Sequence, residues 1–291
     1  MHKFKEKGPS FLIIAVIYLI AFLTGILVYN SSLWNHMLVA TLFANIAATL
    51  VVWFFGVILK NSSIYDPYWS IAPIIIILFW TSSQNTIFSL TGILFLAAVF
   101  IWGIRLTLNW AMRWNGLDHQ DWRYSRLKRN NPRIWFLTNL FGINLMPTLI
   151  VFVALTPVYY SIGLKARFSI ISFFGFALCI TAVLIQSIAD RQMDLFRDKR
   201  NSKNKYIDKG LWHYCRHPNY LGEVLFWWGI WLIQIGARPG IWITIIGPII
   251  VTLLFIFISI PLMEKYISET KPGYHNYKKK VPMLLPGLGK Q

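Results

Sequence analysis

Long apolar runs, separated by short polar segments, make up most of the chain. The runs lack the alternation of barrel strands, and about 20 apolar residues in a helix are enough to cross a bilayer. Because lipid admits only helices and closed barrels, each run is a candidate transmembrane helix. The runs lie at 11–29, 37–59, 67–80, 86–108, 134–157, 168–189, 220–236 and 241–262. The pattern predicts an all-α integral membrane protein, a multi-pass bundle of seven or eight transmembrane helices.

Three features of the apolar runs bear on the number of transmembrane helices. The third run is short and contains Pro67 and Pro73, and only residues 236–240 separate the last two runs. The first run follows a basic segment, as in a signal peptide, but it has no clear small-residue cleavage site. We therefore expect a retained first span and leave the total at seven or eight.

Composition and charge agree with this interpretation. Only 13% of the residues are charged, about half the usual share, which argues against a cytosolic globular protein. Lysine and arginine number 28 against 11 acidic residues. With eight spans and a cytoplasmic N-terminus, 24 of these 28 fall on the cytoplasmic side, as the positive-inside rule requires. The cytoplasmic segments would be 1–10, 60–66, 109–133, 190–219 and 263–291.

The same distribution determines what we expect of localisation and partners. Both termini are predicted to be cytoplasmic. The frequent Ile, Lys and Asn are typical of an AT-rich bacterial genome, and we expect the bacterial inner membrane as the location, although composition by itself does not identify the membrane. Membrane topology accounts for most of the net charge of +17, so no nucleic-acid partner is predicted. No loop is long enough to bury its own core, which predicts one structural unit. The sequence does not indicate the oligomeric state.

Ionisable residues inside spans or at their ends are costly and are functional candidates by default. Two sets recur at helical spacing and so share one helix face. The first is Trp102, Arg105, Asn109 and Arg113, and the second is Gln186, Asp190, Asp194 and Arg197. Snorkelling and a basic flank also explain the first set, but a flank does not explain the acidic stripe of the second.

Two further clusters lie at the starts of predicted helices. Residues 216–223 begin the seventh run, where Glu223 would be carried into the bilayer on the face of Asn219. Residues 65–69 begin the third run, where Asp66 is either a helix N-cap or a catalytic acid between two phenols, Tyr65 and Tyr68. Near the chain end, Glu264 is explained equally well by a membrane-surface anchor or a ligand contact.

A metal site is not expected. His213, Cys215 and His217 lack the spacing of a zinc site, and Arg216 would repel a cation. The chain also lacks the glycine-rich dinucleotide fingerprint and the phosphate-binding loop. A nucleotide would therefore have to bind by a route specific to membrane proteins.

The run from Gly210 to Glu223 resembles a signature shared by membrane steroid 5α-reductases, sterol C14 and C7 reductases and isoprenylcysteine carboxyl methyltransferases. Residues 66–69, 102–105, 121–124 and 186–197 resemble the reductase branch, in particular its bacterial relatives. The resemblance covers roughly residues 60–285. It implies N-terminal transmembrane helices over 1–59 followed by a catalytic membrane domain over 60–291.

The resemblance also implies a cofactor and a site. In the family, NADPH lies in a cytoplasm-facing cavity among the helices, and a carboxylic acid and a tyrosine polarise an enone carbonyl. The implied catalytic residues are Asp66, Tyr65 and Tyr68. The implied cofactor contacts are Asn109, Arg113, Asp190, Asp194, Arg197, Arg216, His217, Asn219, Tyr220 and Glu223. Where the steroid enzymes carry a Gln-Glu pair before a proline, this chain carries Tyr65-Asp66.

Three functions follow from these residues. Arginines at the helix ends suit a pyrophosphate and a 2′-phosphate, which favours a reductase acting on a lipidic substrate from the bilayer. Asp190, Asp194 and Glu223 would also suit the cationic sulfonium of S-adenosylmethionine, which keeps a methyltransferase open. A lipid-binding protein without turnover is the third alternative.

Overall fold

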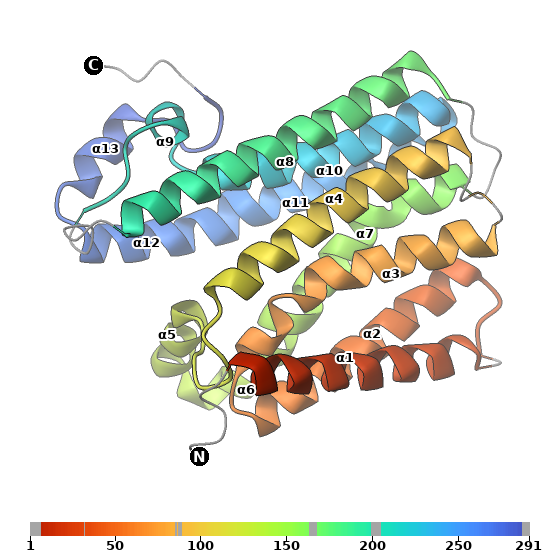
Figure 1. Ribbon diagram of the computed structural model, residues 1–291, viewed down its shortest axis with the longest axis horizontal. Coiled ribbons are helices and arrows are strands. Elements are labelled where there is room, and N and C mark those ends of the chain that lie inside the picture. Colours follow the sequence, from red (N-terminus) through yellow and green to blue (C-terminus); the bar gives the residue numbers. More distant parts are fainter. Residues whose placement is uncertain are drawn as a thin grey trace. The chain divides into compact units, whose positions relative to one another are not determined.

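The computed structural model describes residues 7–31, 33–84, 86, 89–162, 168–198 and 205–286 (Figure 1). These residues form helices and connecting turns, with no strand among them. The α-helices are α1 (Lys7–Tyr29), α2 (Met37–Ile58), α3 (Tyr68–Ser83), α4 (Leu90–Arg113), α5 (Trp122–Asn130), α6 (Trp135–Leu137), α7 (Met146–Ile162), α8 (Ile170–Arg197), α9 (Leu211–Tyr214), α10 (Pro218–Ala237), α11 (Ile246–Leu254), α12 (Ile260–Thr270) and α13 (Tyr274–Lys280). The predicted all-α class is confirmed.

Short segments of 3₁₀- or π-helix extend several of these helices. They are η2 (Ser62–Tyr65), η3 (Pro132–Ile134), η4 (Thr138–Leu145), η5 (Pro239–Ile245) and η6 (Phe255–Ser259). η3, α6, η4 and α7 follow one another without a break over 31 residues, and η5 to α12 do so over 32. Both stretches are thus longer than the apolar runs that predicted them.

Seven helices among the described residues are long and apolar enough to cross a membrane. They are Lys7–Tyr29, Met37–Ile58, Ser62–Ser83, Leu90–Arg113, Pro132–Ile162, Ile170–Arg197 and Pro239–Thr270. The eighth candidate, α10, has 20 residues but carries Asn219, Glu223 and Gln234. A multi-pass membrane protein is therefore confirmed, while the orientation and the kind of membrane stay predictions. Lys3 and Lys5 near the N-terminus, and Lys165 and Arg167 between the fifth and sixth apolar runs, lie outside the described residues.

The chain divides into two compact units. The first comprises residues 1–87 and 99–155, and the second comprises residues 88–98 and 156–291. Of the predicted site residues, Tyr65, Asp66, Tyr68, Asn109 and Arg113 belong to the first unit. All the others belong to the second. The predicted boundary between residues 59 and 60, and the cytoplasm-facing cavity, stay predictions.

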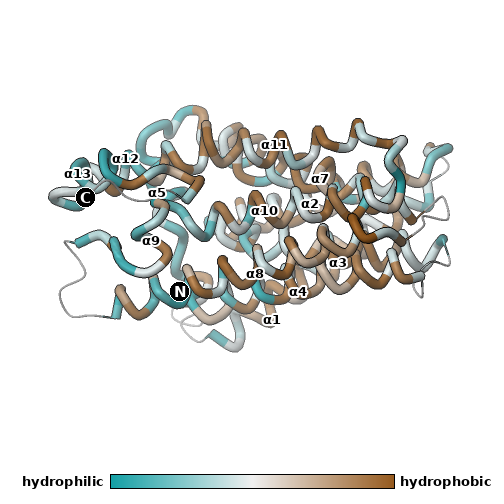
Figure 2. Tube along the Cα trace, turned by 90° about the horizontal axis from the view of Figure 1, so that it is seen from above, coloured by the Kyte–Doolittle hydropathy of each residue, from teal (hydrophilic) through white to brown (hydrophobic). Residues whose placement is uncertain are grey.

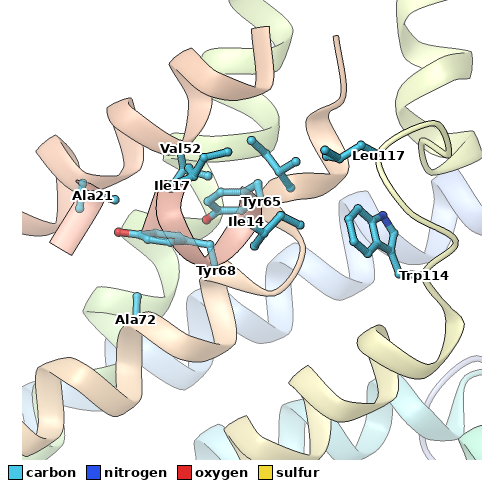
Figure 3. Close-up of a cluster of buried hydrophobic side chains, with 11 residues drawn as sticks. Ile14, Ile17, Ala21, Val52, Tyr65, Tyr68, Ala72, Trp114 and Leu117 are labelled. Atoms are coloured by element: carbon cyan, nitrogen blue, oxygen red, sulfur yellow. The ribbon is translucent and has the colours of Figure 1, made fainter. Parts of the chain in front are cut away.

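The core of the first unit surrounds the segment that carries Asp66. Figure 3 shows Tyr65 and Tyr68 gathered with Ile14 and Ile17 of α1 and Val52 of α2. The Tyr18 hydroxyl donates a hydrogen bond of 2.6 Å to the Ile64 carbonyl. The first two helices thus hold the start of α3, where the predicted catalytic residues lie.

In the second unit, α8 and α10 run side by side (Figure 1). Gly222, Gly229 and Gly236 recur every seven residues on α10 and face α8, and Gly175 faces back from α8. A Cβ at Gly229 would lie 2.5 Å from Cys179 Sγ, and one at Gly175 would lie 2.5 Å from the Ile233 nitrogen. Small residues allow the two backbones to approach, as is typical of membrane helix pairs.

Hydropathy along the second unit changes sharply near the chain end. The tube of α11 is coloured hydrophobic and that of α13 hydrophilic (Figure 2). α13 carries Lys278, Lys279 and Lys280 in its last turn. The apolar span thus leads into a basic segment within one unit.

Candidate functional site

A buried carboxylate lies between α8 and α10. Glu223 is 5% exposed, and its Oε2 accepts a hydrogen bond of 2.8 Å from Gln186 Nε2. Its Oε1 accepts one of 3.1 Å from Trp227 Nε1, one turn further along α10. The absence of a side chain at Gly222 makes this possible, because a Cβ there would lie 2.4 Å from Gln186 Cγ. Helix packing and site geometry are thus set by the same glycine.

Two acceptor atoms beside this carboxylate have no partner among the described residues. They are Gln186 Oε1 and Asn219 Oδ1, both buried. Buried polar atoms in native proteins are almost always hydrogen-bonded, so an ordered water or a ligand would complete this pair. With Glu223, the site is rich in acceptors and suits a group that donates hydrogen bonds. An amide, an amine or ribose hydroxyls would fit.

The acidic stripe of α8 begins one turn beyond Gln186. Asp190 and Asp194 are half-buried, and Arg197 is exposed in the last turn of the helix. α8 is continuous through all four positions, which confirms that they share helical spacing. Gln186 and Glu223 are joined by a direct hydrogen bond, while the roles of Asp190, Asp194 and Arg197 stay predictions.

The arginine and histidine before α10 are held by one glutamate. Arg216 Nε lies 2.6 Å from Glu264 Oε1, and His217 Nε2 lies 3.2 Å from the same oxygen. Lys278 Nζ lies 2.7 Å from Glu264 Oε2. Arg216, His217 and Glu264 are all buried. The charge of Arg216 is thus already compensated within the protein.

Burial lowers the pKa of His217 below its ordinary value. The charges of Arg216 and Lys278 act in the same direction, and the hydrogen bond to Glu264 opposes them. The ring is therefore neutral near pH 7 and can donate from Nε2. Its plane stacks on Tyr220, at 5.4 Å between ring centroids.

Arg216 also ties the C-terminal segment to the start of α10. Its Nη1 donates to the carbonyls of Lys278, at 2.9 Å, and of Val281. Its backbone nitrogen donates to the Pro282 carbonyl at 3.0 Å. The Tyr277 hydroxyl of α13 donates to the Trp212 carbonyl of α9. Residues far apart in the sequence therefore form one buried cluster beside Asn219.

In the first unit, Asp66 pairs with a tyrosine of α5. The Tyr124 hydroxyl donates a hydrogen bond of 2.5 Å to Asp66 Oδ1. Burial and the charge of Asp66 raise the pKa of Tyr124 well above its ordinary value, so the phenol stays protonated. Asp66 is the C-cap residue of η2. It is therefore not the N-cap of α3, the purely structural interpretation of its position.

Asp121 and Arg123 hold α5 in place for this contact. Asp121 caps α5 by accepting from the Arg123 nitrogen at 2.8 Å, and it pairs with the Arg123 side chain through both oxygens. Burial alone would raise the pKa of Asp121, but the Arg123 guanidinium holds it below its ordinary value. The Asp121 nitrogen donates to Ser63 Oγ at 2.8 Å. α5 is thus fastened to the segment that carries Asp66.

The hydroxyls of Tyr65 and Tyr68, on either side of Asp66 in the sequence, form hydrogen bonds with other residues. Tyr65 OH forms a hydrogen bond of 2.7 Å with Thr148 Oγ1, and Tyr68 OH donates to Asn45 Oδ1 at 3.1 Å. Tyr68, Asn45 and Thr148 line a small hollow of about 10 Å³, whose other walls are mostly apolar. A cavity of that volume has room for about one water molecule.

The other two predicted residues of the first unit lie on α4. Asn109 and Arg113 are both half-buried in its last two turns. They share that helix with Trp102, which is fully buried against Trp69 at 5.7 Å between ring centroids. Their assignment to a cofactor stays a prediction.

Sequence patterns did not predict several of the residues that complete these clusters. Tyr124 lies in a stretch that resembles the reductases, but no pattern gives it a role. Glu264 and Lys278 are compatible with a membrane-surface anchor or a ligand contact, and no sequence pattern singles out Asn45. Their partners are distant in the sequence, 58 residues away for Tyr124 and 48 for Glu264, so only the fold brings them together.

Comparison with known proteins places the chain in a family. An uncharacterised protein of Schizosaccharomyces pombe is 26% identical over 274 residues, which cover 82% of this chain and 76% of that protein. A methanethiol S-methyltransferase of Crocosphaera subtropica is 29% identical over 126 residues, 40% of this chain and 46% of that enzyme. No solved structure matches significantly. The model of a family described as proteins of unknown function (DUF1295) matches residues 52–281. The chain therefore belongs to this family, a member of the steroid 5α-reductase-like superfamily of membrane enzymes.

Proposed function

We propose that the protein is a membrane-embedded reductase. It would transfer hydride from NADPH to an activated C=C bond of a steroid-like, isoprenoid or other lipidic substrate that enters from the bilayer. The observation that carries this proposal is the hydrogen bond between Tyr124 and Asp66. A methyl transfer has no need of a protonated phenol fixed to a carboxyl group.

The chemistry of enone reduction explains why the Tyr124–Asp66 pair would matter. When hydride adds to the β-carbon of an enone, negative charge develops on the carbonyl oxygen, and a hydrogen-bond donor must stabilise it. Tyr124 stays protonated, and its hydroxyl, which donates to Asp66 in the unliganded protein, would turn to the enone oxygen when substrate binds. In the same core, Tyr65 and Tyr68 are further phenols, with ring centroids 5.6 Å apart. The first unit therefore contains protonated phenols that could serve as donors once substrate displaces their present partners.

The second unit fits the cofactor. Glu223, Gln186 and Asn219 present acceptors to amide or hydroxyl donors, and two of those acceptors lack a partner among the described residues. Arg197 is the cation of this unit that we assign to a phosphate. Glu264 already compensates the charge of Arg216, which with His217 would hold the start of α10. NADPH, when bound, supplies the hydride.

Cofactor binding is the first test. Thermal unfolding of the detergent-purified protein should shift upward with NADPH more than with NADH, and not with S-adenosylmethionine. Glu223→Gln, Asn219→Ala and Arg197→Ala should each weaken NADPH binding while the unliganded unfolding midpoint stays within a few degrees. Unchanged affinity in all three variants would contradict the site.

Catalysis is tested separately. Tyr124→Phe should lower kcat by about 10² to 10³ in NADPH oxidation with a panel of steroid and isoprenoid enones, the typical effect of losing one oxyanion donor. Asp66→Asn, which alters the partner of that hydroxyl, should also lower kcat. NADPH affinity should not change. Tyr29→Phe, which removes a hydroxyl for which the described residues offer no hydrogen bond, is the matched control. Full activity in Asp66→Asn would remove this residue from catalysis.

A second function, methyl transfer from S-adenosylmethionine, is favoured by the match to a methanethiol S-methyltransferase. The acceptor-rich site around Glu223 would also suit a cationic ligand. Stabilisation by S-adenosylmethionine without any response to NADPH would select this function. A response to neither cofactor would favour a lipid-binding protein without turnover.

A further inference from the structure

The connection between α4 and the next span carries a dense basic surface. We define the α5 basic surface as Lys128, Arg129 and Arg133, all three exposed. Lys128 and Arg129 lie in the last turn of α5, and Arg133 lies in η3. Residues 122–137 contain no acidic side chain. Among the described residues, no carboxylate pairs with any of these three cations.

This surface lies beside the membrane. One candidate span ends at Arg113 and the next begins at Pro132, so both ends of the connection lie on the same side of the bilayer. Directly after Arg133, the side chains of Ile134, Phe136 and Leu137 are more than half exposed. Exposed apolar side chains at the start of a span face lipid tails, so the three cations lie at headgroup depth.

The helix that carries Lys128 and Arg129 is fixed at both ends. Lys128 Nζ lies 6.0 Å from the centre of the Trp135 ring, which joins the end of α5 to α6. At the other end of α5, the Asp121 cap and the Tyr124 contact to Asp66 fix the helix to the core of the first unit. A preorganised set of cations loses little entropy when it binds an anion.

We propose that the α5 basic surface is a binding site for the phosphate headgroups of anionic phospholipids. Three exposed cations without acidic partners complement a negative charge, and the adjacent apolar side chains complement the acyl chains. Each Lys or Arg close to an anionic membrane surface contributes roughly a fivefold gain in affinity. A site built from three of them should therefore select anionic over zwitterionic lipid by about two orders of magnitude.

Native mass spectrometry tests this directly. The protein is purified from membranes, exchanged into detergent with equal amounts of phosphatidylglycerol and phosphatidylcholine, and the bound lipids are counted. The wild type should retain phosphatidylglycerol preferentially. A triple variant, Lys128→Gln with Arg129→Gln and Arg133→Gln, should lose most of that preference, and Arg129→Gln alone should lose about fivefold.

The matched control removes the same charge elsewhere. Lys265→Gln with Lys279→Gln and Lys280→Gln changes three exposed lysines of the second unit, and this variant should keep the preference. Equal loss in both triple variants would reduce the effect to net charge and overturn the site. So would an unchanged preference in the α5 variant.

A nucleotide phosphate is the competing ligand for this surface. If the α5 triple variant kept its lipid preference but bound NADPH more weakly in pure phosphatidylcholine, the surface would belong to the cofactor and the proposal would fall. The lipid measurement needs no turnover. Its failure is therefore distinguishable from a failure of the reductase assignment.

Discussion

At the scale of single residues, Glu264 is the centre of a charged cluster in the second unit. Three cationic or potentially cationic side chains share its two oxygens, and two of them, Arg216 and His217, are buried. A buried ion pair adds little stability over an apolar equivalent, but removing one partner leaves an uncompensated charge. We therefore expect the loss of one partner in this cluster to destabilise the folded protein.

Glu264→Gln should lower the free energy of unfolding by about 3–5 kcal/mol, because the buried Arg216 guanidinium loses its counter-charge. Thermal unfolding in detergent measures the effect. Asp118→Asn removes an exposed carboxylate and should leave the midpoint within about 0.5 kcal/mol of wild type. An equally small effect of Glu264→Gln would show that Arg216 is compensated by its backbone carbonyl partners instead.

His217 should make stability depend on pH. Its pKa in the folded protein is lowered, mainly by burial, so the unfolded chain binds a proton more readily. The contribution of the neutral His217 ring to stability is then fully present above about pH 6.5, the ordinary histidine pKa. It is lost as the pH falls below that value. The facing groups are Glu264, Arg216, Lys278 and the ring of Tyr220.

The measurement is the unfolding midpoint between about pH 7.5 and pH 5. The unfolding midpoint of His217→Gln should fall less steeply toward acid pH than that of the wild type. His213→Gln, at an exposed position, should show the wild-type slope. Parallel slopes in all three proteins would mean that another group carries the acid sensitivity.

What the sequence reveals about individual residues depends on how close their partners are. Helical spacing was enough to place Gln186 to Arg197 on one helix face, because those positions lie within a few turns. It was not enough to pair Asp66 with Tyr124, since no local pattern links residues in different helices. Glycine at position 222 likewise gave no sign that it makes room for Gln186.

At the scale of elements, the α8–α10 pair depends on small residues at the contact. Gly229→Ala should destabilise the protein by about 1–3 kcal/mol, because the new methyl group would lie 2.5 Å from Cys179 Sγ and 2.9 Å from the Gly175 carbonyl oxygen. Thermal unfolding again reports the change. Gly240→Ala, where a Cβ meets nothing within 4 Å, should be nearly neutral.

Apolar runs located the helices well but not their ends. The run at 168–189 became a helix that continues to Arg197, because a helix can leave the bilayer without changing its backbone. The run at 220–236 began earlier, at Pro218, which suits the first helical turn. Polar residues in α10, including Glu223, are what keep this helix out of the seven clearest spans.

At the scale of the whole molecule, the number of spans fixes the positions of the two termini. With eight spans, including α10, both termini lie on the cytoplasmic side, whereas seven spans place them on opposite sides. Single cysteines introduced as Gly8→Cys and Lys279→Cys, both exposed, report this through a membrane-impermeant maleimide. Each should react in inverted vesicles and not in intact cells.

The native thiols should not interfere with that measurement, because Cys179 and Cys215 are both buried. Labelling of the two introduced cysteines from opposite sides would show that seven spans are correct and that α10 does not cross.

The all-α class and the multi-pass character could be predicted from the sequence, since an apolar run of about 20 residues forms a helix long enough to cross a bilayer. Packing within each unit could not, because it depends on contacts between distant segments.

The contacts of Arg216 also imply an order of events during biosynthesis. A growing chain is extended at about 5–20 residues per second, so α10 is made several seconds before residues 264–282 exist. Until then the arginine has neither its glutamate nor the carbonyls that cap it. The start of α10 therefore matures only after the last helices are made. In that interval, the exposed cation is a feature that membrane chaperones and proteases can recognise.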